Sequence, residues 1–101
     1  MNRNVLLVGL KAIVVEDARK RITARDVSLF SATSLEEVRK VFDEQTIDSV
    51  IVGAGLDLET RMQIVRHVFE ASDTTTVHLK DKASGPQGFL PFVNSVLSSK
   101  T

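Results

Sequence analysis

The stretch that decides the fold runs Val50-Ile51-Val52-Gly53-Ala54-Gly55. An apolar run with no polar position, followed directly by small residues, is typical of a strand that is buried on both faces and leaves the sheet in a tight turn. The run Val5-Leu6-Leu7-Val8-Gly9 repeats this pattern near the start of the chain. Both segments are therefore predicted to be central strands of a parallel sheet.

Two further apolar runs, Val27–Phe30 and Val77–Leu79, are interrupted by polar residues such as His78, as expected of edge strands with one less-covered face. A stretch patterned like an amphipathic helix follows each of the four runs, and strands that alternate with helices pair in parallel. With the fully apolar runs in the centre, the strand order is 2-1-3-4. The predicted fold is α/β: a three-layer, doubly wound parallel sheet of four strands with helices on both faces, formed by residues 1–101 as a single domain.

Right-handed crossovers place the first helix on one face of the sheet and the second and third helices on the other. The second helix is predicted to begin in a capping box built on Thr33 or Ser34, and Asp57 can cap the third. The predicted apolar stripe of the third helix is Met62, Val65, Val68 and Phe69. The area beside the first helix is predicted to be covered by the last segment, through Phe89, Phe92, Val93, Val96 and Leu97.

The last segment leaves two alternatives, because a proline inside a helix costs about 3 kcal/mol or more. Its helix begins either near Pro86, with a kink at Pro91, or near Pro91 after an ordered loop, and the later start is favoured. Its apolar residues outnumber what one helix on a small sheet readily buries. We therefore expect an exposed remainder there, and a homodimer or another protein complex formed through this segment.

Composition narrows the function classes. The 101 residues include 13 Lys and Arg against 13 Asp and Glu, so the formal net charge is zero and no basic excess predicts a nucleic-acid partner. The absence of Cys excludes disulfides and thiolate metal sites, and we expect neither a metal nor a cofactor. The apolar runs are far shorter than the roughly 20 residues that span a bilayer, so we expect no membrane association and a soluble cytoplasmic protein.

The residues that follow the four strands are expected to share one rim, because parallel strands end at the same edge of a sheet. Backbone N–H groups at turns and lysine side chains together suit an anion. The candidate ligand-binding residues are Gly9, Lys11, Gly53, Gly55, His78, Lys80, Lys82, Ser84 and Gly85. The alternative interpretation is that His78 and Lys80 belong to a solvated edge strand followed by a well-capped loop.

No complete catalytic motif occurs at this rim. Gly53-Ala54-Gly55 begins like a dinucleotide-binding turn, but Leu58 stands where a third small residue is needed, and Ser31, not an acidic residue, closes the second strand. The chain also lacks a P-loop and a hydrolase nucleophile elbow. No catalytic residues are predicted, and the sequence favours a protein that is not an enzyme.

The segment Asp48–Asp57 resembles the third strand and following loop of bacterial response-regulator receiver domains, which have a flavodoxin-like fold. In those domains the phosphorylated aspartate ends this strand, and here Gly53 stands in its place. The acidic pair that holds magnesium corresponds to Gly9-Leu10, and the hydroxyl residue that ends the fourth strand corresponds to Lys80. The resemblance therefore implies a degenerate receiver-like domain that cannot be phosphorylated on aspartate. The chain equally resembles the first half of a Rossmann domain without its nucleotide-binding fingerprint.

Two functions follow as hypotheses. The first is a small non-catalytic binding module that recognises a protein partner or a second copy of itself. The second is a site for a small anionic or phosphate-bearing ligand at the carboxyl ends of the strands, with or without enzymatic activity.

Overall fold

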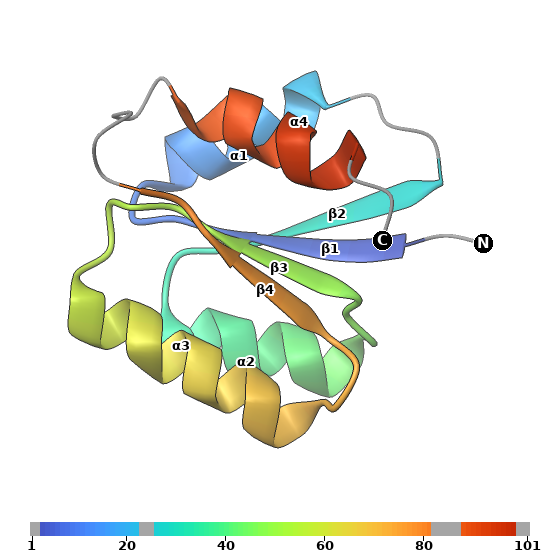
Figure 1. Ribbon diagram of the computed structural model, residues 1–101, viewed down its shortest axis with the longest axis vertical. Coiled ribbons are helices and arrows are strands. Elements are labelled where there is room, and N and C mark those ends of the chain that lie inside the picture. Colours follow the sequence, from blue (N-terminus) through green and yellow to red (C-terminus); the bar gives the residue numbers. More distant parts are fainter. Residues whose placement is uncertain (1–2, 23–25, 82–87, 99–101) are drawn as a thin grey trace.

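The computed structural model has a sheet of four parallel strands in the order β2-β1-β3-β4, which confirms the predicted fold class (Figure 1). The structure describes residues 3–22, 26–81 and 88–98. The elements in chain order are β1 (Arg3–Val8), α1 (Ala12–Arg21), β2 (Val27–Ala32), α2 (Leu35–Glu44), β3 (Ser49–Val52), α3 (Leu58–Ala71), β4 (Thr76–Leu79) and α4 (Phe89–Ser98). Helices α1 and α4 cover one face of the sheet, and α2 and α3 cover the other.

The burial of each strand matches its place in the sheet. All four residues of β3 are buried, and so are the last four residues of β1, which pair with them from Val5↔Ser49 to Val8↔Val52. The residues of β2 and β4 are mostly half-buried or exposed. An uninterrupted apolar run is stable only where neighbouring strands and helices remove it from water on every side, and this condition places β1 and β3 in the centre.

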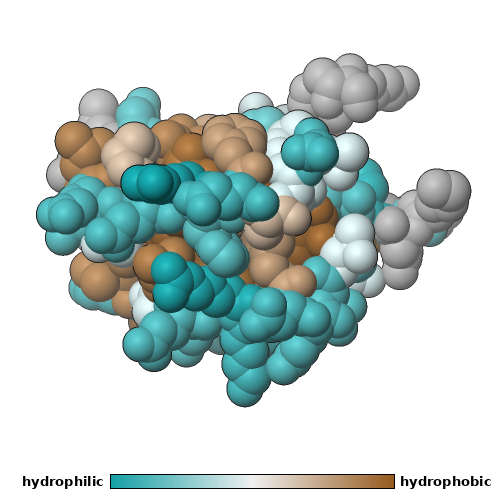
Figure 2. Space-filling model, turned by 90° about the horizontal axis from the view of Figure 1, so that it is seen from below, coloured by the Kyte–Doolittle hydropathy of each residue, from teal (hydrophilic) through white to brown (hydrophobic). Residues whose placement is uncertain are grey.

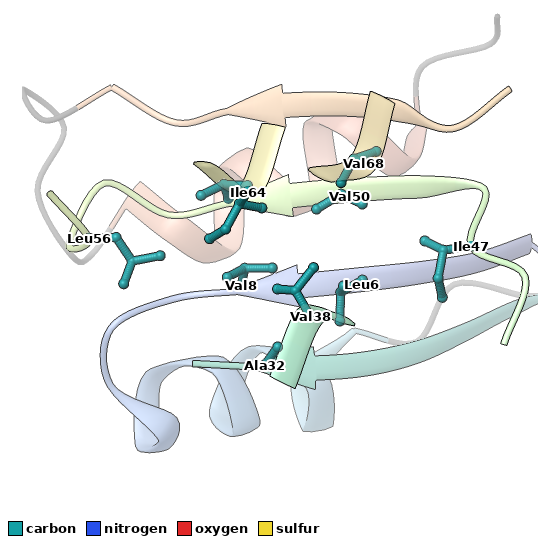
Figure 3. Packing of buried hydrophobic residues seen from close by; sticks show 10 residues of the cluster. Leu6, Val8, Ala32, Val38, Ile47, Val50, Leu56, Ile64 and Val68 are labelled. Atoms are coloured by element: carbon teal, nitrogen blue, oxygen red, sulfur yellow. The ribbon is translucent and has the colours of Figure 1, made fainter. Parts of the chain in front are cut away.

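Each face of the sheet carries its own hydrophobic core. Successive residues of a strand point to opposite faces, so Leu6 and Val8 of β1 pack toward α2 and α3, whereas Leu7 packs toward α1 and α4. Figure 3 shows the first of these cores, where Val38 of α2 and Ile64 of α3 lie over the strands. Full burial of an aliphatic side chain contributes roughly 1.5–3 kcal/mol relative to exposure, so the two cores hold the three layers together.

Side-chain caps fix where α2 and α3 begin. Ser34 Oγ accepts a hydrogen bond from the N–H of Glu37 at 3.2 Å, and Glu37 Oε1 accepts one from the N–H of Thr33 at 2.6 Å. The predicted capping box is therefore built on Ser34. Its reciprocal bond to Glu37 comes from the N–H of Thr33, one residue before the N-cap. Asp57 Oδ1 caps α3 by accepting from the N–H of Thr60 at 2.7 Å. In contrast, α1 begins without a side-chain cap.

Helix α3 presents a different face to the core from the predicted one. Arg61, Ile64 and Val68 are its buried residues, whereas Met62 and Phe69 are exposed, so the predicted stripe was wrong except for Val68. Both sets of residues recur at intervals of three and four, and the helical period alone does not choose between them. Which set is buried depends on how α3 is rotated about its axis when it packs against both the sheet and α2.

Helix α4 begins at Phe89, closer to the later of the two predicted starts. Pro91 then lies in the first turn, where a backbone N–H has no partner within the helix. The missing N–H of proline therefore costs little at this position. The alternative start near Pro86 falls on residues 82–87, which lie outside the described residues.

The expected exposed remainder on α4 is not found among its described residues. Phe89 and Val93 are buried, and the other large apolar side chains of this helix pack against the core beneath α1 and α4. The exposed large apolar side chains lie elsewhere, on α3, on β4 and at the start of α1. None of the described helices combines the length and the apolar character that a membrane crossing requires.

Candidate functional site

A row of three residues, Gly9, Gly53 and Lys80, crosses the carboxyl end of the sheet. Each follows directly after its strand, and each backbone N–H donates to the last residue of the neighbouring strand. The three bonds are Gly9 to Ala32 O at 3.2 Å, Gly53 to Val8 O at 2.7 Å and Lys80 to Val52 O at 2.9 Å. The parallel register therefore continues one residue past the strands and places the three side by side.

The two glycines of this row keep space open beneath α1 and α4. A Cβ on Gly9 would lie 2.8 Å from Val15 Cγ2 of α1, and a Cβ on Gly53 would lie 3.3 Å from Phe89 Cε1 of α4. The first distance is a steric clash and the second is a tight contact. The two helices therefore approach the end of the sheet because these positions carry no side chain.

A cavity of about 360 Å³ lies at this end of the sheet. Its lining residues are Gly9, Leu10, Lys11, Val14, Val15, Gly53, Ala54, Gly55, Lys80 and Phe89. The chain leaves β1 toward one face and β3 toward the other, so the cavity lies where the sheet reverses its winding, the place at which doubly wound sheets bind ligands. Its volume falls at the small end of the range for ligand sites, about 300–1,000 Å³.

Lys80 is buried, with only 3% of its surface exposed. Its Nζ donates to the carbonyl oxygen of Asp81 at 3.0 Å, and no carboxylate of the described residues forms a salt bridge with it. The interpretation of Lys80 as a solvated edge residue was therefore wrong. Lys80 points to the face of the sheet that α4 covers. Helix α4 comes after β4 in the chain, so the burial of Lys80 depends on how α4 packs against the sheet. A buried lysine without a paired carboxylate is uncommon and suits a site that receives an anion.

The start of α1 forms a second polar feature of the cavity wall. The N–H groups of Leu10 and Lys11, which line the cavity, and of Ala12 and Ile13, which open the helix, have no acceptor in the part of the chain that the structure describes. The N-terminus of a helix carries a partial positive charge and favours an anion. The N–H groups of Gly9 and Gly53 are not available for this purpose, because the sheet uses both.

The charge of the described cavity wall is positive. Lys11 and Lys80 are its ionisable residues, and it includes no carboxylate, imidazole or hydroxyl group. The remaining wall consists of glycines and apolar side chains, with Phe89 as its aromatic member. Such a wall can hold the apolar body of a ligand and neutralise an acidic group on it, but it supplies no acid–base pair for catalysis.

A second cavity, of about 420 Å³, lies at the end of β2 and contrasts with the first. Its polar residues include Glu16 and Glu37, and both carboxylates already accept hydrogen bonds, from Ser31 at 2.5 Å and from Thr33 at 2.9 Å. The hydrogen bond from Ser31 lowers the pKa of Glu16 below its ordinary value, and Arg19 adds to this effect while partial burial opposes it. These side chains satisfy one another, so this cavity offers less to a ligand than the first.

The structure gathers five of the nine candidate residues at one cavity: Gly9, Lys11, Gly53, Gly55 and Lys80. His78 is not among its lining residues, and its Nε2 lies 3.2 Å from Thr76 Oγ1. The remaining candidates, Lys82, Ser84 and Gly85, lie outside the described residues.

Sequence reasoning missed the apolar half of the cavity wall. Leu10 and Ala54 stand inside the turns that were singled out, so their positions in the chain were a usable signal. Phe89 was assigned to the core alone, and nothing local in the sequence shows that its ring reaches over Gly53.

No protein-family model, no curated protein and no solved structure matches this chain. Among the described residues no three His, Asp or Glu side chains gather in a group able to hold a metal ion.

Proposed function

We propose that this protein binds a small organic anion, with a carboxylate or phosphate group on an apolar body, in the cavity at the ends of β1 and β3. The observation that carries the proposal is the buried Lys80 in the wall of a cavity that the uncapped start of α1 also lines. The acidic group would lie between the ammonium group of Lys80 and the N–H groups at the start of α1. The apolar body would pack against Phe89 and Val14.

The cationic groups serve binding better than catalysis. A charge-assisted hydrogen bond is roughly twice as strong as a neutral one, so two lysines and several N–H groups are enough to orient an acid. The described wall holds no base or nucleophile other than the lysines. We therefore favour a binding protein and propose no reaction.

An NMR titration tests this function. Benzoate, inorganic phosphate and adenosine monophosphate serve as probes, and the amide signals of Gly9, Gly53 and Gly55 report on the cavity because few glycines crowd that region of the spectrum. At least one of the two organic anions should shift these signals, and Lys80→Met should weaken its binding at least tenfold. The matched control Lys40→Met, on α2, should leave the binding unchanged.

Two outcomes would contradict the proposal. One is the absence of shifts with every probe at millimolar concentrations. The other is a set of shifts confined to the opposite end of the sheet, near Asn4 and Asp48, which are hydrogen-bonded at 2.8 Å far from the cavity. The hypothesis of a protein partner rests on a different surface, on α3 and β4.

A further inference from the structure

Exposed apolar side chains gather along one edge of the molecule. Leu58 and Phe69 of α3 are 61% and 58% exposed, and Met62 of the same helix and Leu79 of β4 are exposed as well. In Figure 2, which shows the face that α2 and α3 form, hydrophobic side chains gather in the upper half, and the lower border is hydrophilic. Apolar surface that is gathered in this way on a small protein marks an interaction site.

The exposed apolar residues of α3, together with the half-buried Val65, form a single stripe. Leu58, Met62, Val65 and Phe69 recur at intervals of four, three and four residues. At about 100° per residue the stripe lies roughly a quarter turn away from the buried face of the helix. On the opposite flank His67 packs against Phe42 of α2, with ring centroids 5.8 Å apart. The stripe therefore faces away from α2, toward the edge of the sheet that β4 forms.

The outer edge of β4 carries backbone groups that no described residue uses. The N–H groups of Thr76 and Lys80 donate to Asp48 and Val52, toward β3. Because the direction alternates along a strand, the N–H and C=O groups of Val77 and Leu79 point away from β3. The side chains of Val77 and Leu79 lie on the α3 face of the sheet, since Val77 packs against the core beneath α2 and α3.

We infer that a second copy of this chain docks against this edge in antiparallel orientation. A twofold axis through His78 pairs Val77 with Leu79 of the second copy, and the reverse, so that four hydrogen bonds join the two β4 strands. The two sheets become one sheet of eight strands, and the α3 stripes pack against each other above it. This dimer is independent of the proposed anion site, which lies at the carboxyl ends of the strands.

One twofold axis can relate both the two α3 helices and the two β4 strands. The midpoint of the stripe lies between residues 63 and 64, about 11 Å from the end of α3 at Ala71, at a rise of 1.5 Å per residue. His78 lies about 10 Å from Thr75 at a rise of about 3.3 Å per residue. A turn of three residues, Ser72–Thr74, joins Ala71 to Thr75, so the two midpoints lie at nearly the same level.

Charge complementarity argues for a second copy as the occupant. In the antiparallel pair of α3 helices, Leu58 meets Phe69 of the second copy and Met62 meets Val65. This arrangement brings Glu59 beside Arg66 of the second copy on both sides of the axis. Both side chains are exposed, and Arg66 also donates to Glu70 of its own chain at 2.9 Å. The formal net charge of zero adds no repulsion between the copies.

Sedimentation equilibrium of the full chain tests the dimer at tens of micromolar. The native chain should have twice the 11.1 kDa mass of the monomer. Phe69→Glu and Glu59→Arg should each weaken association at least tenfold, and the double variant Glu59→Arg with Arg66→Glu should recover most of the loss. Ile13→Lys, at a position 77% exposed on α1 and away from the α3 stripe, is the control and should leave the association unchanged. A native chain that is monomeric up to hundreds of micromolar would overturn the inference, and so would a dimer that Phe69→Glu leaves intact.

A cross-link tests the strand register separately. Directly opposed residues of this kind have Cα atoms about 4.5 Å apart, which lies within the range for a disulfide, about 4.4–6.8 Å. The chain has no Cys, so His78→Cys should form a single disulfide across the axis under mild oxidation. Glu36→Cys, at an exposed position of α2, should remain unlinked. Equal cross-linking of the two variants would refute the antiparallel pairing of β4.

Discussion

Lys80→Met is expected to remove anion binding without destabilising the protein. Methionine keeps most of the length and the apolar stem of lysine and loses the ammonium group. In the native protein this group is part of a side chain that is only 3% exposed, and its hydrogen bond goes to the carbonyl oxygen of Asp81. The substitution therefore separates the contribution of the stem to packing from the contribution of the charge to a ligand.

The expected change in the free energy of unfolding is small and favourable. A hydrogen bond from a charged group contributes about 1.5–3 kcal/mol, and Lys80→Met loses it. Removal of the buried charge recovers a desolvation cost of several kcal/mol. Asp81 is exposed, so its carbonyl group can bond to water instead. We expect a stabilisation of about 0–2 kcal/mol, which corresponds to an increase in Tm of up to roughly 15 °C in a domain of this size.

Urea unfolding followed by circular dichroism measures this change, and the NMR titration with benzoate and adenosine monophosphate measures binding on the same samples. Lys80→Arg serves as the control that keeps the positive charge. A destabilisation by Lys80→Met of more than about 1 kcal/mol would show that the ammonium group is a structural anchor, and unchanged affinity for the anions would show that it does not meet the ligand.

Three further predictions concern the rest of the fold. Gly9→Ala should cost about 1–3 kcal/mol, because its Cβ would lie 2.8 Å from Val15 Cγ2; adding Val15→Ala should recover part of this cost in urea unfolding, and strict additivity would refute the clash. Ser31→Ala should raise the pKa of Glu16, read from its carboxyl ¹³C shift in a pH titration. Folding lowers the pKa of Glu16, so the stability that its carboxylate contributes is present above the ordinary pKa of 4.5 and is lost as the pH falls through the folded pKa. The native chain should therefore lose slightly more stability than Ser31→Ala in that pH range. An unchanged pKa of Glu16 in Ser31→Ala would contradict the role of the hydroxyl. Ile64→Ala should cost about 2–5 kcal/mol in urea unfolding, and a loss below about 1 kcal/mol would contradict the observed orientation of α3.

Sequence patterns were most informative where a single local condition decides the outcome. The apolar runs at Val5–Val8 and Val50–Val52 fixed the strand order, because only a central strand of a doubly covered sheet removes every side chain from water. The Ser34 and Asp57 caps were visible for a similar reason, since each bond spans three residues. Candidate residues after the strands could be named because parallel strands share one carboxyl edge.

The orientation of α3 and the burial of Lys80 were not predictable in this way. Two apolar stripes compete on α3, and the one that contains Ile64 faces the sheet because α2 occupies the flank beside His67. Lys80 is buried because α4 packs over the face of the sheet to which Lys80 points, and its place between Leu79 and Asp81 in the sequence does not show this.

The amino-acid sequence by itself therefore determined the parallel α/β fold, its strand order and the edge at which a site would lie. Those features follow from periodicity and from bonds between residues close in the chain. Only the tertiary structure decided that Lys80 is buried beside this edge, that Phe89 reaches over Gly53 to leave a cavity, and that the exposed apolar side chains lie on α3, on β4 and at the start of α1, not on α4. The physical reason is that burial is a property of surfaces brought together from distant parts of the chain, and helical periodicity specifies which residues share a face without specifying which face is covered.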